Sequence, residues 1–157
     1  MPSVRSSFEE RDHVLHLPRR VRVLSTRPTV LVVERDRSIR ELQRVFLERA
    51  GFTVDFVEDG ITALERTTAE SPAVVITEIL IPGLDGLTLC RRLRDEPATA
   101  HIPVIVFTIL AAAARAAEAG AHAFQRKPIV ESTFVAAVLE AIQTHSPATT
   151  EQQWASR

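Results

Sequence analysis

The sequence predicts an α/β domain: a doubly wound, five-stranded parallel sheet in the order 2-1-3-4-5, with helices on both faces in a three-layer sandwich. Three observations predict it. Apolar, β-branched runs recur along the chain, as expected of strands covered on both faces. Each run is followed by apolar residues at helical spacing, and glycines or prolines separate the units. Strands that alternate with helices favour right-handed crossovers and a parallel sheet.

The first two strand–helix units occupy one continuous stretch. The runs "TVLVVE" (29–34) and "FTVDFV" (52–57) are rich in β-branched residues and predict strands. Helical spacing predicts helices over 38–49 and 59–69, which a glycine and a proline bring to an end. The side chains expected to face the core are Ile39, Leu42, Val45, Phe46 and Leu47 in the first helix, and Ile61, Ala63, Leu64 and Thr68 in the second.

Three further units complete the predicted sheet. Strands are expected in the runs "AVVIT" (73–77), "IPVIVFT" (102–108) and "HAFQ" (122–125). Helices are expected over residues 84–94, 110–120 and 131–146, the middle one dominated by alanine. In the first of these helices the side chains expected to be buried are Leu87, Leu89, Cys90 and Leu93. The simplest interpretation of the cysteine is therefore a small core residue.

Composition excludes several classes of function. The chain has 157 residues, 25% of them charged, and a formal net charge of −1, which is typical of a soluble globular protein and gives no overall basicity for nucleic acid. One cysteine excludes an internal disulfide. The chain contains no apolar run of about 18 residues, so no membrane insertion is expected and the predicted location is cytoplasmic.

Two segments flank the predicted domain, which covers residues 29–144. Residues 1–28 are mixed in charge and broken by prolines, and predict a flexible arm. The arginines at positions 19, 20 and 22 are a candidate phosphate-binding patch, but no aromatic residues are interleaved with them, so DNA is an unlikely partner. Residues 145–157 predict a disordered tail, in which Trp154 is a candidate for docking onto the domain.

Polar residues follow four of the five expected strands. Because the carboxyl ends of parallel strands meet at one edge, and ligands collect there, these residues are candidates for a common site. They are Glu34, Arg35 and Asp36 after the first strand, Glu78 after the third, Thr108 at the end of the fourth and Lys127 after the fifth. An aspartate just before a helix satisfies its free amides, so Asp36 is also predicted to cap the first helix.

Four motifs in this order resemble the receiver domain of bacterial two-component response regulators, whose fold is flavodoxin-like. They are "VLVVERD", "VITEILIPGLDG", "VIVFT" and "FQRKP". The resemblance implies an acid pair and a phosphoacceptor aspartate that hold Mg²⁺, with a hydroxyl and a lysine on the phosphoryl oxygens. By position, Glu34 matches the first acid, Thr108 the hydroxyl, Lys127 the lysine, Pro128 the proline that often follows a cis bond, and Phe124 the aromatic that couples site to surface.

The sequence departs from this pattern in three ways. Arg35 stands where the second metal-binding acid belongs, and Glu78 stands where the phosphoacceptor aspartate belongs. The segment after the fourth strand is also shorter than is usual in the family. The formal charges of Glu34, Arg35, Glu78 and Lys127 cancel, whereas Mg²⁺ prefers carboxylates. We therefore expect Mg²⁺ binding to be lost, no other cofactor and no enzymatic activity, with the guanidinium of Arg35 close to Glu78.

Three functions stay open at this point. The leading one is a phosphorylation-independent module that binds another signalling protein, such as a histidine kinase, regulator or effector, through its fourth helix, fifth strand and fifth helix; a homodimer is a further candidate. In this function Glu78 either imitates the phosphorylated state, with Phe124 turned inward and Thr108 drawn toward the acid, or is a relic. The second function is an active phosphoreceiver that uses Glu78 or another acceptor. The third is a DNA-associated regulator that binds through residues 1–28.

Overall fold

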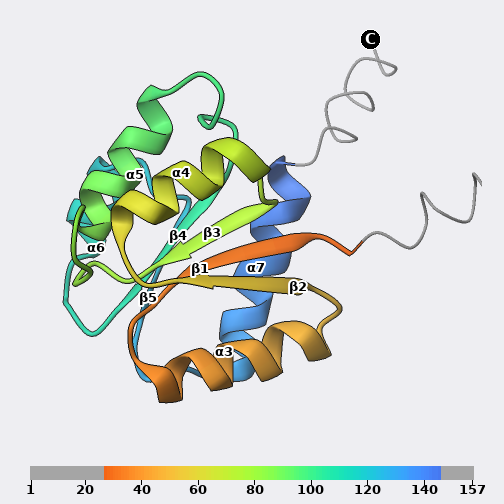
Figure 1. The fold of residues 1–157 in the computed structure, drawn as a ribbon. Coiled ribbons are helices and arrows are strands. Elements are labelled where there is room, and N and C mark those ends of the chain that lie inside the picture. Colours follow the sequence, from red (N-terminus) through yellow and green to blue (C-terminus); the bar gives the residue numbers. More distant parts are fainter. Residues whose placement is uncertain (1–26, 146–157) are drawn as a thin grey trace, which may run out of the picture.

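The computed structural model describes residues 27–145 and confirms the predicted doubly wound parallel sheet (Figure 1). The strand order is β2-β1-β3-β4-β5, and every neighbouring pair is parallel. The strands are β1 (Thr29–Val33), β2 (Thr53–Val57), β3 (Val74–Thr77), β4 (Val104–Thr108) and β5 (Ala123–Arg126). The order reverses between β1 and β3, which is where a ligand cleft is expected in such a sheet.

Helices cover both faces of the sheet, so the molecule has three layers (Figure 1). They are α3 (Arg37–Arg49), α4 (Gly60–Glu70), α5 (Gly86–Asp95), α6 (Ala113–Glu118) and α7 (Glu131–His145). α4, α5 and α6 pack on one face, and α3 and α7 pack on the other. Parallel strands buried on both sides explain why the strand runs are continuously apolar.

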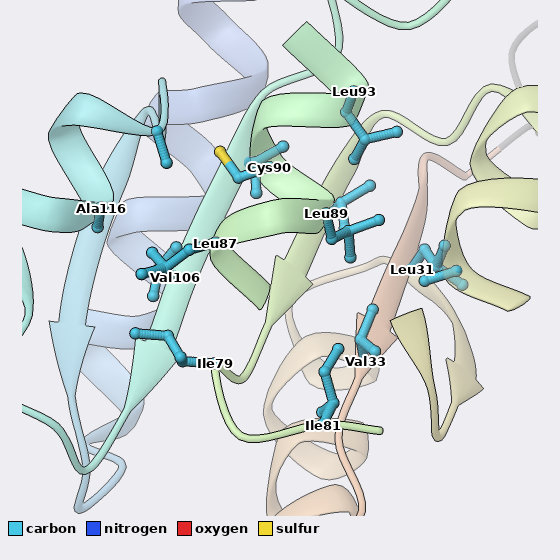
Figure 2. Close-up of a cluster of buried hydrophobic side chains, with 14 of the residues drawn as sticks. Leu31, Val33, Ile79, Ile81, Leu87, Leu89, Cys90, Leu93, Val106 and Ala116 are labelled. Carbon is cyan, nitrogen blue, oxygen red and sulfur yellow. The ribbon is translucent and has the colours of Figure 1, made fainter. Parts of the chain in front are cut away.

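The two cores are separated by the alternation of side chains along each strand. In β1, Leu31 and Val33 point into the core beneath α4, α5 and α6, while Val30 and Val32 point into the core beneath α3 and α7. Figure 2 shows the first core, in which α5 contributes the four side chains predicted to be buried. Cys90 is fully buried among them, which confirms its interpretation as a core residue.

Four side chains that were expected to face the core are exposed instead. Leu42 and Val45 of α3 are each 44% exposed, Ile61 of α4 is 50% exposed, and Thr68 also lies on the surface. The stripe of α3 that meets the sheet passes through Gln43 and Leu47, flanked by the half-buried Ile39 and Phe46. Leu42 and Val45 are rotated away from it, because successive helical residues are about 100° apart.

The predicted helix over residues 110–120 is shorter in the structure, where α6 has six residues. Its first turn is replaced by a loop, in which the Leu110 amide donates to the Thr108 hydroxyl at 3.3 Å and the Ala112 amide donates to the Leu110 carbonyl at 3.0 Å. Gly120 follows the helix at a φ of 91°, a backbone conformation that favours glycine. The shortened helix agrees with the shortened sequence in this region.

Two local features position the loops at the carboxyl edge. Asp36 caps α3, with its side chain accepting the Ile39 amide at 3.1 Å, which confirms the predicted cap. Gly86 begins α5 directly against the backbone carbonyl of Glu78, where a β-carbon would collide with that oxygen. Only glycine therefore lets α5 approach the end of β3 this closely.

Several predictions fall on residues outside the described range 27–145. These are most of the flexible arm, with its arginines at positions 19, 20 and 22, and the tail from residue 146 onward, with Trp154. Between residues 27 and 145, no helix is long and apolar enough to cross a membrane.

Candidate functional site

Three charged side chains from separate strands meet at the carboxyl edge of the sheet. The Nζ of Lys127, which follows β5, lies 2.6 Å from Oε1 of Glu34 after β1 and 2.8 Å from Oε2 of Glu78 after β3. All three side chains are at most 10% exposed. Lys127 thus bridges two buried carboxylates, and we call this arrangement the Glu34–Lys127–Glu78 triad.

The second oxygen of each carboxylate is bonded to the backbone. Oε2 of Glu34 accepts the amides of Arg35 and Asp36 at 2.9 and 3.2 Å. Oε1 of Glu78 accepts the amides of Ile79 and Leu80 at 2.7 and 3.2 Å. A buried carboxylate is stable only when such partners replace its lost water. Each acid in the triad has one oxygen on the ammonium group and one on two amides.

Thr108 also reaches this cluster from the end of β4, where it is fully buried. Burial by itself would raise the pKa of Glu78, but hydrogen bonds from Lys127, Thr108 and the Leu80 amide, with the positive charge of Lys127, outweigh it. The pKa of Glu78 therefore lies below its usual value. The side chain is an anion at neutral pH.

The same balance acts on Lys127 with the opposite sign. Burial favours the neutral amine, but the hydrogen bonds and negative charges of Glu34 and Glu78 outweigh burial and raise the pKa of Lys127. The ammonium group also lies 5.6 Å from the ring centroid of Phe107, within the range of a cation–π contact. The lysine is held as a cation.

An open pocket of about 460 Å³ lies above the triad. Its floor is the triad, while Arg35, Asp36, Ile39, Leu80 and Ile109 form its sides. Leu80 and Ile109 are 58% and 57% exposed, and sequence reasoning missed both. The sequence did contain a signal for both residues, because each is an apolar residue in a loop that closely follows a polar residue at a strand end.

The position of Arg35 corrects one expectation. Arg35 is exposed at the rim of the pocket, and within residues 27–145 it makes no ion pair with Glu78. The cation on Glu78 is Lys127. The reason is geometric, because the backbone amide of Arg35 is bonded to Glu34 inside the pocket while its long side chain is directed to solvent.

Two further predicted residues lie beside the triad. Phe124 of β5 is half-buried and packs against the core beneath α4, α5 and α6. Pro128 follows Lys127 through a cis peptide bond, as the resemblance implied. The structure thus gathers Glu34, Glu78, Thr108 and Lys127 into one cluster, with Arg35 and Asp36 at its edge.

The donor set of the pocket does not fit Mg²⁺. This ion requires near-octahedral oxygen ligands, usually including free carboxylates. Here both acids are already bonded through both oxygens, and the cation between them is Lys127. The described residues hold no group of three or more histidine, cysteine or acidic side chains that could bind a metal.

The family model of the response regulator receiver domain matches residues 30–139, which include the triad and all of the sheet except Thr29. The chain belongs to this family. The receiver is 39% identical over 112 residues to the transcriptional regulatory protein CseB of Streptomyces coelicolor, covering 69% of this chain and 47% of that protein. It is 35% identical to the response regulator PleD of Caulobacter vibrioides, covering 64% of this chain and 23% of that protein.

The solved structures agree with this assignment. The receiver domain of a signal transduction histidine kinase from Syntrophus aciditrophicus is 29% identical, with a TM-score of 0.72, and the match covers 76% of this chain and 93% of that one. The receiver spans about half of the length of CseB and less of PleD. The domain is a response regulator receiver domain, with the flavodoxin-like fold of the solved receiver structures.

We expect the Glu78→Gln variant to lose part of the acid dependence of stability. Folding lowers the pKa of Glu78 below its ordinary value of 4.5, so as the pH decreases through this range the unfolded chain binds the proton before the folded chain does. The free energy of unfolding therefore decreases as the pH decreases. Glutamine keeps the volume and does not titrate. Urea unfolding across this acid range should give a shallower decline for Glu78→Gln than for the parent. Glu58→Gln, at an exposed ion pair, is the control, and equal slopes in all three proteins would contradict the assignment.

Proposed function

We propose that this receiver signals without accepting a phosphoryl group. The observation that carries the proposal is the Glu34–Lys127–Glu78 triad, in which the residue at the phosphoacceptor position already holds the lysine. Phosphoryl transfer in this family needs a divalent cation to neutralise the developing charge. A pocket whose acids are paired internally offers that cation no site, so the proposal includes the loss of Mg²⁺ binding and of autocatalytic activity.

The contacts of Glu78 favour imitation of the phosphorylated state. In the family, a hydroxyl and a lysine contact the phosphoryl oxygens. Here the ammonium group of Lys127 lies 2.8 Å from the carboxylate of Glu78, and the Thr108 hydroxyl contributes to the lowered pKa of that acid. The glutamate is one methylene longer than aspartate, which carries its charge further from β3. A ligand biases a two-state domain through contacts that differ between the states. In this receiver a side chain supplies those contacts permanently.

The output of such a domain is a protein contact. We assign it to the surface formed by α6, β5 and α7, with another cytoplasmic signalling protein such as a histidine kinase, regulator or effector as the partner. The half-buried Phe124 of β5 packs against the core beneath α6, three residues before Lys127 of the triad, which suits a coupling residue. A homodimer through the same surface is the second candidate for the partner.

The intact mass after incubation with acetyl phosphate and Mg²⁺ tests the proposal. We expect no added phosphoryl mass, because the acceptor oxygens of Glu78 are bonded and the metal has no ligands. A gain of one phosphate that disappears in Glu78→Gln would establish the alternative, an active receiver that uses Glu78. A gain that survives in Glu78→Gln would establish another acceptor and also contradict the proposal.

A further inference from the structure

An apolar groove runs between α3 and α7, on the side of the molecule away from α6. Its volume is about 400 Å³, and its apolar lining includes Phe46, Val135, Ala136 and Leu139. The ion pair between Arg49 and Glu131, at 3.0 Å, crosses between the two helices at the same place. We call this feature the α3–α7 groove.

Apolar side chains extend the groove along both helices. Leu42 precedes Phe46 by one helical turn, so the two side chains leave α3 in similar directions. Leu139 follows Val135 by one turn on α7, and both Leu42 and Leu139 remain more than 40% exposed. Within residues 27–145 nothing covers these exposed apolar side chains, which favours an occupant.

We propose that residues 146–157 fold back along α7 and place Trp154 in the α3–α7 groove. Trp154 lies nine residues after His145, where α7 ends. An extended segment of that length spans up to about 30 Å. Along the axis of α7, Leu139 lies only about 9 Å and Val135 about 15 Å before the end of the helix. The segment between His145 and Trp154 is therefore long enough for the indole to reach the groove.

The groove is lined in part by α7 itself, through Val135 and Leu139, so a chain that leaves the end of α7 reaches it by turning back along the same helix. The other large exposed apolar side chains of the described residues, apart from Val45 on α3, are Ile61, Leu80, Ile109 and Val130. None of these four lies within α7. Trp154 is also the one large apolar side chain after residue 145, and Arg49 at the groove provides a cation suited to an aromatic face.

Intrinsic fluorescence of the full chain tests this docking directly, because the protein has one tryptophan and no tyrosine. We expect a blue-shifted emission maximum and weak quenching by acrylamide. Leu139→Lys should shift the emission to the red and increase quenching severalfold, because it places a charge in the groove. Ile61→Lys, at a similarly exposed apolar position on α4, should change neither, and circular dichroism verifies the fold of both variants.

Three results would overturn the proposal. The first is parent emission typical of a fully hydrated indole. The second is a blue-shifted emission that is the same in Leu139→Lys as in the parent, since Trp154 would then be buried elsewhere. The third is a blue shift that disappears on dilution, because the occupant of the groove would then be the tail of a second copy. A blue shift that is independent of concentration and sensitive to Leu139→Lys supports docking within one chain.

Discussion

Replacing Lys127 with methionine should destabilise the domain by about 3–5 kcal/mol, the usual cost of removing one partner from a buried ion pair. The methionine side chain fills similar space but leaves Glu34 and Glu78 facing each other without a cation. Both carboxylates are less than 10% exposed, so water cannot replace the ammonium group without opening the site. Urea unfolding at neutral pH measures the loss as a lower transition midpoint.

The matched control for this variant is Arg49→Met, which removes the cation of an exposed pair. Arg49 and Glu131 are 65% and 41% exposed, and such pairs contribute about 0–1 kcal/mol. Adding Glu78→Gln to Lys127→Met should recover part of the loss, since one of the two uncompensated charges is then gone. A cost for Lys127→Met no larger than that for Arg49→Met would show that the triad is hydrated and structurally unimportant.

The double variant Arg35→Asp with Glu78→Asp should acquire phosphoacceptance, raising the phosphorylated fraction from none to a measurable share. The two changes restore an acid pair and the usual acceptor, so the formal charge of the four pocket residues moves from zero to two negative charges. The shorter acid also withdraws from Lys127, which releases the lysine for phosphoryl oxygens. Mg²⁺ then has the carboxylates that it prefers. Acetyl phosphate with Mg²⁺ and intact mass measure the result.

The single variants separate the effect of the residue at position 35 from the effect of the residue at position 78. Glu78→Asp should remain unphosphorylated, because position 35 still supplies an exposed guanidinium in place of the second acid. Arg35→Asp should also remain unphosphorylated, because Glu78 keeps its bonds to Lys127 and to the amides of Ile79 and Leu80. Full phosphorylation of Glu78→Asp would show that Arg35 does not exclude the metal. Magnesium titration by calorimetry distinguishes failure to bind Mg²⁺ from failure of the transfer step.

The fold class, the strand order and the residues at the carboxyl edge could all be predicted from the sequence. These follow from local patterns, because strand and helix periods, turn residues and the handedness of crossovers are all readable along the chain. Parallel strands must bring their carboxyl ends to one edge, so the sequence predicts that Glu34, Glu78, Thr108 and Lys127 lie together. The cap at Asp36 is equally local, because it spans three residues.

How those residues pair depends on contacts between distant parts of the chain. Glu34 and Lys127 are 93 positions apart, and nothing in their local sequence indicates that one ammonium group reaches two carboxylates. Arg35 was a plausible partner for Glu78 by charge, but the direction of its side chain depends on the path of the loop. On α3, the side that carries Gln43 and Leu47 faces the sheet, whereas Leu42 and Val45 lie on the surface. Successive helical residues are about 100° apart, so the rotation of α3 about its own axis decides which side chains are buried. Packing against the sheet and α7 sets that rotation.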